Sequence, residues 1–174
     1  MPVLKNLIPN YRFKKITDIN PEFFNGAELI IVDLDNTLVF PGTVDTKKEI
    51  IDWLSNIKKK YHCIIFSNSF SFFKRAERLS EIFNCELFLS KNKKPFKKLF
   101  YQMQKKYNFD AERVFVVGDR IFTDVLFGNT NNAKTVLIDP LTGKENIFIK
   151  TTRVLEYLTV FISKNFNYNK SNKK

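Results

Sequence analysis

The two aspartates that follow the apolar run of residues 29–32 are the side chains of this sequence best suited to chemistry. The run is rich in β-branched residues, which is typical of a buried strand. Because successive side chains of a strand point to opposite faces, Asp33 and Asp35 share a face where the strand ends. Carboxylates this close repel each other unless a divalent cation or a shared proton relieves the repulsion. One could then act as a nucleophile and the other as an acid and base.

Apolar runs and helical patterns alternate along the chain and predict the elements that position these aspartates. Strands are expected at 28–34, 63–67, 85–89, 113–117 and 134–138. Helices are expected at 45–60, 71–83, 95–107 and 122–130. Strands that alternate with helices form βαβ units with right-handed crossovers. The sequence therefore predicts an α/β fold with a single Rossmann-like core, in which a mostly parallel five-stranded sheet carries helices on both faces.

Polar residues gather at the expected carboxyl ends of the strands, where open α/β sheets bind ligands. These residues are Ser67-Asn68-Ser69 after the second strand, Gly118-Asp119-Arg120 and Thr123-Asp124 after the fourth, and Lys94-Pro95 before the third helix. The carboxylates of Asp33, Asp35 and Asp119 are hard oxygen ligands of the kind that Mg²⁺ prefers. Ser67, the amides near Asn68 and Lys94 supply donors for a phosphate. A magnesium half beside an anion-binding half predicts phosphoryl transfer.

Taken in order, these clusters resemble the four motifs of haloacid dehalogenase (HAD) superfamily phosphatases. The matching residues are Asp33-x-Asp35-x-Thr37, Ser67, Lys94 and Gly118-Asp119-x-x-x-Thr123-Asp124. Residues 10–139 are similar to the YqeG-like branch of subfamily IIIA, chiefly through segments 33–39 and 118–126. Members of that branch resemble phosphatidylglycerophosphate phosphatases, which act in phosphatidylglycerol and cardiolipin synthesis. The resemblance implies a HAD core and the dephosphorylation of phosphatidylglycerophosphate to phosphatidylglycerol.

The resemblance also implies catalytic and metal-binding roles. Asp33 would attack phosphorus and form an aspartyl-phosphate. Asp35 would protonate the leaving oxygen and then activate water. Mg²⁺ would be held by Asp33, the main-chain carbonyl of Asp35 and Asp119. Asp124 would support the metal directly or through water, and these two alternatives stay open.

The remaining matches concern the phosphate and a turn. Ser67, Asn68 and Lys94 would hold the phosphoryl oxygens. Lys94 is chosen for its Lys-Pro context among several lysines, and Lys93 is the alternative. Thr37 would shape the turn after the first strand.

Two positions depart from the pattern of the YqeG-like branch. Ser69 stands where a second asparagine is common, and Arg120 stands where glutamine often follows the aspartate of the fourth motif. Neither position touches the implied catalytic roles. Arg120 could add affinity for an anionic headgroup, so the identity of the substrate stays open.

The spacing of the motifs bears on substrate size. Asp33 and Ser67 are 34 positions apart, and Lys94 and Asp119 are 25 apart. One expected helix and one expected strand account for the length of each interval. Neither gap has room for the cap domain that encloses small metabolites in many HAD enzymes. We therefore expect an uncapped, open site, which suits a lipid headgroup, a protein side chain or the end of a nucleic acid.

The chain of 174 residues carries a formal net charge of +11, and residues 87–109 hold seven lysines and no acid. This charge favours anionic partners, namely nucleic acid, an acidic membrane surface or phosphorylated substrates. Cys63 and Cys85 form no CxxC pair, so we expect reduced, buried thiols. The sequence shows neither a signal peptide nor an apolar run of ~18 residues that could span a bilayer. These features predict a cytoplasmic protein, with peripheral contact at the inner membrane face left open.

We expect one capless domain over residues 1–165 and a basic, disordered tail over 166–174. Apolar positions within 144–165 predict a last amphipathic helix, which either packs on the domain or contacts a membrane. The substrate alternatives are a nucleic-acid terminal phosphate or a phosphoprotein. A further alternative is a non-catalytic, basic RNA-binding module on a HAD scaffold. Aspartates after strands often form only Asx turns, but four such clusters in order favour the enzyme. The oligomeric state is not predicted.

Overall fold

The computed structural model describes residues 5–69 and 72–141 of the chain. The helix expected at 144–165 and the tail expected at 166–174 lie outside the described residues, as does the extent of the domain beyond 141.

A parallel six-stranded sheet lies at the centre of the described chain, with the strand order β1-β6-β5-β2-β3-β4. The strands are β1 (Tyr11–Phe13), β2 (Leu29–Asp33), β3 (Cys63–Phe66), β4 (Glu86–Leu87), β5 (Val114–Gly118) and β6 (Lys134–Ile138). The predicted α/β fold is therefore confirmed, but the predicted count of five strands is wrong. The sixth strand is β1, a three-residue edge strand whose exposed residues gave no apolar pattern. β4 is also shorter than the predicted 85–89.

The described helices fall at the positions that the sequence predicted. They are α2 (Lys48–Lys58), α3 (Phe72–Phe83), α4 (Lys97–Tyr107) and α5 (Leu126–Thr130). The last expected helix, 122–130, begins as a π-helical turn, η4 (Ile121–Val125), which runs directly into α5. Three short 3-10 helices complete the described elements: η1 (Ile16–Asp18), η2 (Pro21–Phe24) and η3 (Ala111–Arg113).

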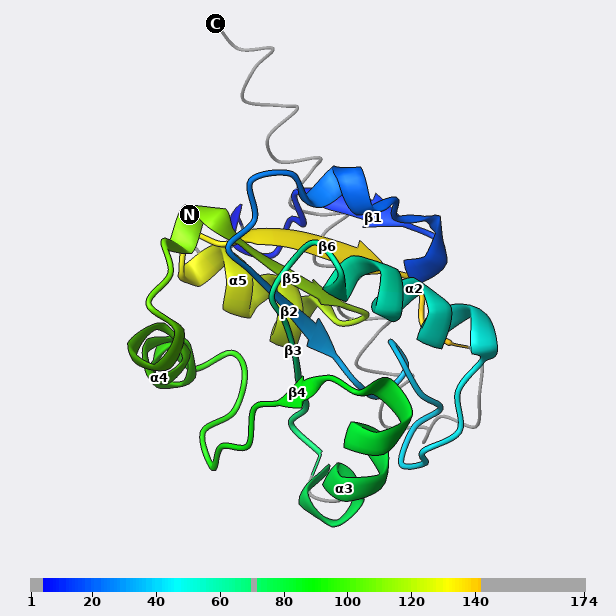
Figure 1. Ribbon diagram of the computed structural model, residues 1–174. Coiled ribbons are helices and arrows are strands. Elements are labelled where there is room, and N and C mark those ends of the chain that lie inside the picture. Colours follow the sequence, from blue (N-terminus) through cyan, green and yellow to red (C-terminus); the bar gives the residue numbers. More distant parts are fainter. Residues whose placement is uncertain (1–4, 70–71, 142–174) are drawn as a thin grey trace, which may run out of the picture.

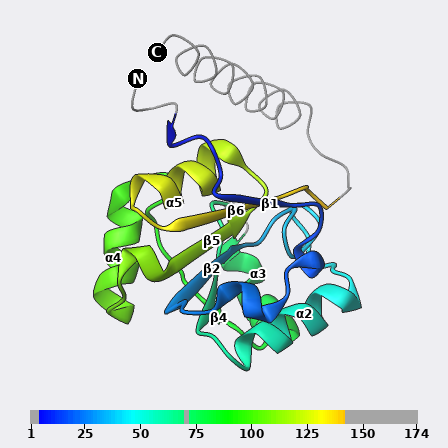
Figure 2. The same cartoon turned by 90° about the horizontal axis from the view of Figure 1, so that it is seen from above.

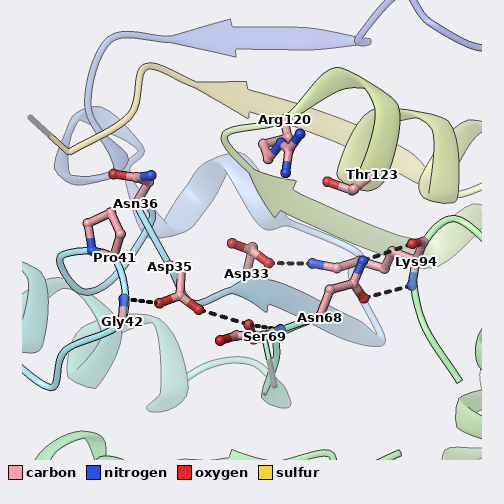
Figure 3. A pocket seen from close by; sticks show the side chains of 11 residues that line it. Asp33, Asp35, Asn36, Pro41, Gly42, Asn68, Ser69, Lys94, Arg120 and Thr123 are labelled. Carbon is pink, nitrogen blue, oxygen red and sulfur yellow. Dashed lines mark hydrogen bonds and ion pairs between the residues drawn. The ribbon is translucent and has the colours of Figure 1, made fainter. Parts of the chain in front are cut away.

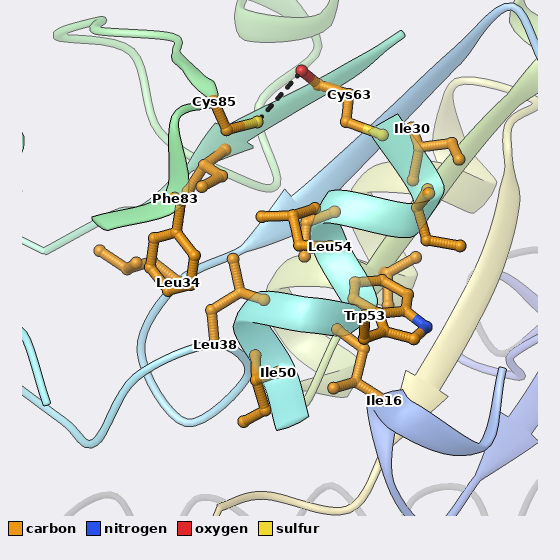
Figure 4. Close-up of a cluster of buried hydrophobic side chains, with 14 of the residues drawn as sticks. Ile16, Ile30, Leu34, Leu38, Ile50, Trp53, Leu54, Cys63, Phe83 and Cys85 are labelled. Carbon is orange, nitrogen blue, oxygen red and sulfur yellow. Dashed lines mark hydrogen bonds between the residues drawn. The ribbon is translucent and has the colours of Figure 1, made fainter. Parts of the chain in front are cut away.

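The alternation of β2 side chains divides the core into two layers. Ile30 and Val32 pack with apolar residues of α2 and α3, such as Trp53 (Figure 4). Leu29 and Ile31 pack on the opposite face with apolar residues of α4 and α5. Accordingly, α2 and α3 cover one face of the sheet and α4 and α5 cover the other (Figures 1 and 2). Burial on both faces is the usual environment of parallel strands, and it explains why β2 is a continuous apolar run.

The strand order brings β2 between β3 and β5. Because all three run in the same direction, their carboxyl ends meet at one edge of the sheet, where ligands bind in such folds. The segments from Asp33 to Ser67 and from Lys94 to Asp119 hold only short loops, α2, β3, α4, η3 and β5. No domain is inserted in either segment, as the spacing of the motifs predicted.

Candidate active site

A pocket of about 300 Å³ lies at the carboxyl ends of β2 and β3, beside the turn after β5 (Figure 3). Its lining residues are Asp33, Asp35, Asn36, Pro41, Gly42, Ser67, Asn68, Ser69, Lys94, Arg120 and Thr123. Five of the residues predicted from the sequence, two acidic, two polar and one basic, therefore line the same pocket. Asp119 and Asp124 lie close behind the carboxylate of Asp33.

The carboxylate of Asp33 and the ammonium group of Lys94 form the buried centre of the site. Lys94 Nζ lies 2.5 Å from Asp33 Oδ1 and 2.6 Å from Asp124 Oδ1. Burial, reinforced by the nearby carboxylates of Asp124 and Asp119, raises the pKa of Asp33 well above its usual value, although Lys94 opposes the shift. Burial alone would lower the pKa of Lys94, but the two carboxylates outweigh burial and raise it. Lys94 is therefore a permanent positive charge beside the expected nucleophile.

Three carboxylates converge in a way that fits a hard divalent cation. Asp33, Asp119 and Asp124 are all buried, and each offers an oxygen within 4.8 Å of the other two. Oxygen donors of this kind suit Mg²⁺, whose charge would offset a repulsion that Lys94 alone only partly relieves. The sequence placed Asp33 and Asp119 together correctly. The side chain of Asp35 lies outside this cluster, so only its main-chain carbonyl stays a predicted ligand.

Asp124 is held in place by the π-helical turn η4. Its Oδ2 accepts hydrogen bonds from the main-chain N–H of Arg120 at 3.1 Å and from Thr123 Oγ1 at 3.3 Å. The carboxylate packs directly on the Cα of Gly118, where an added Cβ would come within 2.3 Å of Asp124 Cγ. A glycine at the end of β5 is therefore required for this carboxylate to reach the cluster.

The carboxylate of Asp35 sits in a separate set of hydrogen bonds. Gly42 N–H donates to Oδ1 at 2.8 Å, and Ser67 Oγ donates to Oδ2 at 2.9 Å. Arg75 Nη2 lies 3.0 and 3.1 Å from the two oxygens. The side chain stays partly accessible from the pocket, with 22% of its surface exposed. This location, next to Asp33 yet in contact with solvent, suits a group that exchanges protons with substrate and water.

The polar residues after β3 contact the site in two different ways. Ser67 Oγ donates to Asp35 and accepts a hydrogen bond from Ser69 N–H at 3.0 Å. The side chain of Asn68 holds the main chain of Lys94, since Nδ2 donates to its carbonyl and Oδ1 accepts from its N–H, both at 2.8 Å. The Asn68 side chain thus positions Lys94, and its contact with phosphate stays a prediction. Of the two lysines that the sequence left open, Lys94 reaches Asp33, whereas Lys93 lines a neighbouring groove.

Thr37 is fully buried and lies in the turn that follows β2. Its main-chain N–H donates to the carbonyl of Leu34 at 3.2 Å. Asn36, just before it, adopts a left-handed conformation with φ of 65°. The turn at these two residues leads the chain back, and the N–H of Gly42 then reaches the carboxylate of Asp35.

Arg75 is a charged residue of the site that the sequence analysis did not single out. It is buried on α3, and its guanidinium group contacts Asp35 and the main-chain carbonyl of Thr43. A signal existed in the sequence, because Arg75 lies four positions before the buried Leu79, on the apolar stripe of its helix. A charged residue on a buried stripe needs a partner, and here the partner is the predicted acid and base.

The fold and the arrangement of the site define the chain as a HAD-type phosphatase. Among solved structures, a predicted HAD-like family hydrolase from Porphyromonas gingivalis matches with a TM-score of 0.55 at 13% identity, covering 74% of this chain and 98% of that one. A HAD-hydrolase, YfnB from Bacillus subtilis, described as putative and solved bound to magnesium, matches with a TM-score of 0.50 at 14% identity, covering 70% and 91%. At these identities the two structures support the fold.

The sequence comparisons narrow the class to one family. A family model described as mitochondrial PGP phosphatase, where PGP is phosphatidylglycerophosphate, matches residues 3–142. A probable phosphatase, YqeG of Bacillus subtilis, is 30% identical over 158 residues, 87% of this chain and 88% of the relative. The chain belongs to the PGP phosphatase family, and the predicted YqeG-like resemblance is confirmed.

A longer relative is itself named as a phosphatidylglycerophosphate phosphatase. Phosphatidylglycerophosphate phosphatase 1 of Arabidopsis thaliana, a chloroplastic and mitochondrial protein, is 28% identical over 153 residues, 82% of this chain and 44% of the relative. This chain therefore spans less than half of that protein.

Proposed function

We propose that the protein is a Mg²⁺-dependent phosphomonoesterase that removes the terminal phosphate of phosphatidylglycerophosphate and releases phosphatidylglycerol. The observation that carries this proposal is the convergence of Asp33, Asp119 and Asp124 beside a pocket that also holds Asp35 and Lys94. The substrate rests on the similarity to the PGP phosphatase family and to its plant relative. We expect the enzyme to act as a peripheral protein at the cytoplasmic face of an anionic membrane.

In the first half of the proposed reaction, Asp33 attacks phosphorus and the bond between phosphorus and the leaving oxygen breaks. Asp35 gives its proton to that oxygen, so the glycerol oxygen of the lipid leaves as a hydroxyl group rather than as an alkoxide. Lys94 supplies positive charge for the phosphoryl oxygens. Ser67, whose hydroxyl donates to Asp35 in the free site, turns it to a phosphoryl oxygen when substrate binds. The result is an aspartyl-phosphate on Asp33 and a deprotonated Asp35.

In the second half, Asp35 takes a proton from water, and the resulting oxygen attacks the aspartyl-phosphate. The bond between Asp33 and phosphorus breaks, phosphate leaves, and both carboxyl groups return to their starting forms. Asp33, the main-chain carbonyl of Asp35 and Asp119 would hold Mg²⁺, with Asp124 beside them. Bound Mg²⁺ would neutralise negative charge that develops on the phosphoryl group.

The direct test is phosphate release from phosphatidylglycerophosphate, measured with Mg²⁺ and with EDTA, for the wild type and for Asp33→Asn. We expect turnover only in the wild type with Mg²⁺, because an amide cannot form the acyl-phosphate. Turnover by the Asp33→Asn variant at the wild-type rate would reject the mechanism. A parallel panel of a phosphorylated oligonucleotide and a phosphopeptide tests the substrate, and preference for either over the lipid would reject that assignment.

A further inference from the structure

Three adjoining hollows, the first of which is the catalytic pocket, lie in a row that reaches the segment between β4 and α4. A hollow of about 240 Å³ shares Ser67, Asn68 and Ser69 with the pocket. On its other side it is lined by Phe73, Ser90, Lys91 and Lys93. The next hollow shares Ser90 and Lys91 and extends to Leu89 and Lys98. The row of hollows thus connects the surroundings of the pocket with residues 89–98 through shared lining residues.

This segment combines exposed apolar side chains with lysines. Leu89 and Phe96 are 49% and 67% exposed, although both are large hydrophobic residues. Lys91, Lys97 and Lys98 are exposed beside them, and residues 87–109 contain no acid that could pair with them locally. Exposed apolar side chains among unpaired basic ones are typical of surfaces that bind at the boundary between lipid headgroups and acyl chains.

We propose that residues 89–98 form a docking face for an anionic lipid bilayer, and this inference rests on the proposed function. The nucleophile Asp33 is buried, so a phosphate on a lipid headgroup reaches it only if the mouth of the pocket meets the membrane surface. Lys91, Lys97 and Lys98 would attract anionic headgroups, and Leu89 and Phe96 would enter the interface. The adjoining hollows beside them would give the headgroup a path to the pocket.

A bilayer fits this face better than a nucleic acid does. Phosphate backbones would satisfy the lysines, and Phe96 could stack on a base, but an exposed leucine offers no π-face for stacking. The transfer of Leu89 and Phe96 from water to an apolar interface is favourable for both side chains. Within the described residues no helix is long and apolar enough to cross a membrane.

The test of the charges is co-sedimentation with vesicles of phosphatidylcholine, with and without phosphatidylglycerol, which is not a substrate. The variant combines Lys91→Gln, Lys97→Gln and Lys98→Gln. Each lysine near an anionic surface contributes roughly fivefold to membrane affinity, so we expect about a hundredfold weaker binding to the anionic vesicles. The matched control combines Lys47→Gln, Lys48→Gln and Lys59→Gln, which remove the same charge from exposed positions around α2, across the sheet. We expect the control to bind nearly as well as the wild type.

The apolar contribution is tested with the double variant Leu89→Ala and Phe96→Ala. We expect this variant to bind vesicles more weakly than the wild type, and we expect the difference to remain at high salt. Tyr11→Ala removes an exposed aromatic side chain from β1, at the opposite edge of the sheet, and serves as the control. Thermal unfolding of every variant checks that it is folded. Equal losses in the two lysine triples, or no binding of the wild type to anionic vesicles, would overturn the docking face.

The docking face and the proposed function can fail separately. Vesicle binding that follows the lysine pattern, without hydrolysis of phosphatidylglycerophosphate, would uphold the face and reject the substrate. Hydrolysis of the lipid, together with equal vesicle binding by the two lysine triple variants, would uphold the substrate and reject the docking face. A single-stranded oligonucleotide that binds residues 89–98 and displaces the vesicles would overturn the bilayer as the occupant of this face.

Discussion

At the scale of single residues, the site separates two carboxylates by giving them different partners. Asp33 faces Lys94 and two further buried carboxylates, whereas Asp35 accepts hydrogen bonds from Ser67, Arg75 and a main-chain N–H. Their environments differ although they lie two positions apart. Asp33 ends β2, whereas the loop after β2, which turns at residue 36, brings the N–H of Gly42 back to Asp35. Separate environments are what a nucleophile and an acid and base require, since each needs its own protonation state.

Arg75 is expected to position Asp35 without touching the substrate. Its guanidinium group links Asp35 to the carbonyl of Thr43, which lies further along the same loop. Arg75→Ala removes this link and leaves the carboxylate to the hydrogen bonds from Gly42 and Ser67. We expect kcat to fall about ten- to a hundredfold, since a displacement of about 1 Å costs as much in other enzymes. The loss in the phosphorylation step, measured in single turnovers, should be larger for an alkyl phosphate than for p-nitrophenyl phosphate, whose leaving group needs no proton.

The control for this prediction is Arg78→Ala, which removes an exposed arginine from the same helix. Arg75→Lys should restore part of the rate, because lysine keeps the positive charge but offers one donor nitrogen in place of the two that Arg75 uses. Equal losses for both leaving groups would indicate a general structural defect and contradict the positioning role.

At the scale of the elements, the sequence predicted those parts of the site that lie directly after buried strands. Asp33 and Asp119 each end an apolar run, so their convergence follows once β2 and β5 are neighbours. Arg75 and the Asn68 side chain act through partners 40 and 26 positions away, and such pairing depends on packing that periodicity does not encode. β1 was missed for a related reason, because a short exposed edge strand is defined by its partner β6.

The junction of β5 and η4 yields a prediction about Gly118. In Gly118→Ala, the new methyl group would occupy the place of the Asp124 carboxylate, so either the turn or the side chain must move. We expect a loss of about 1–3 kcal/mol in the free energy of unfolding, typical of overpacking. We also expect a higher Mg²⁺ concentration for half-maximal activity, measured by titration of phosphate release. Ser55→Ala on an exposed position of α2 is the control. An unchanged Mg²⁺ requirement would contradict the predicted role of Asp124 beside the metal.

At the scale of the whole molecule, two buried cysteines can report whether one layer of the core opens to solvent. Cys63 and Cys85 are both free and buried between the sheet, α2 and α3 (Figure 4). The Cys85 thiol donates to the carbonyl of Cys63 at a sulfur–oxygen distance of 3.4 Å. Burial raises the pKa of Cys85 to about 11 and raises that of Cys63 further. Both thiols are therefore protonated and shielded while this layer is closed.

Alkylation by iodoacetamide at pH 8 should consequently report the opening of the α2–α3 layer. With a pKa of about 11, roughly one Cys85 thiol in a thousand is ionised at pH 8, and only the thiolate reacts. We expect almost no label on the native protein and two labels per chain in urea, counted by intact mass. The exposed thiol of a Ser55→Cys variant should react rapidly in the folded state. If Cys63 and Cys85 reacted as fast as that surface thiol without denaturant, the packing of this layer against β2 and β3 would be contradicted, because only an opened core admits the reagent.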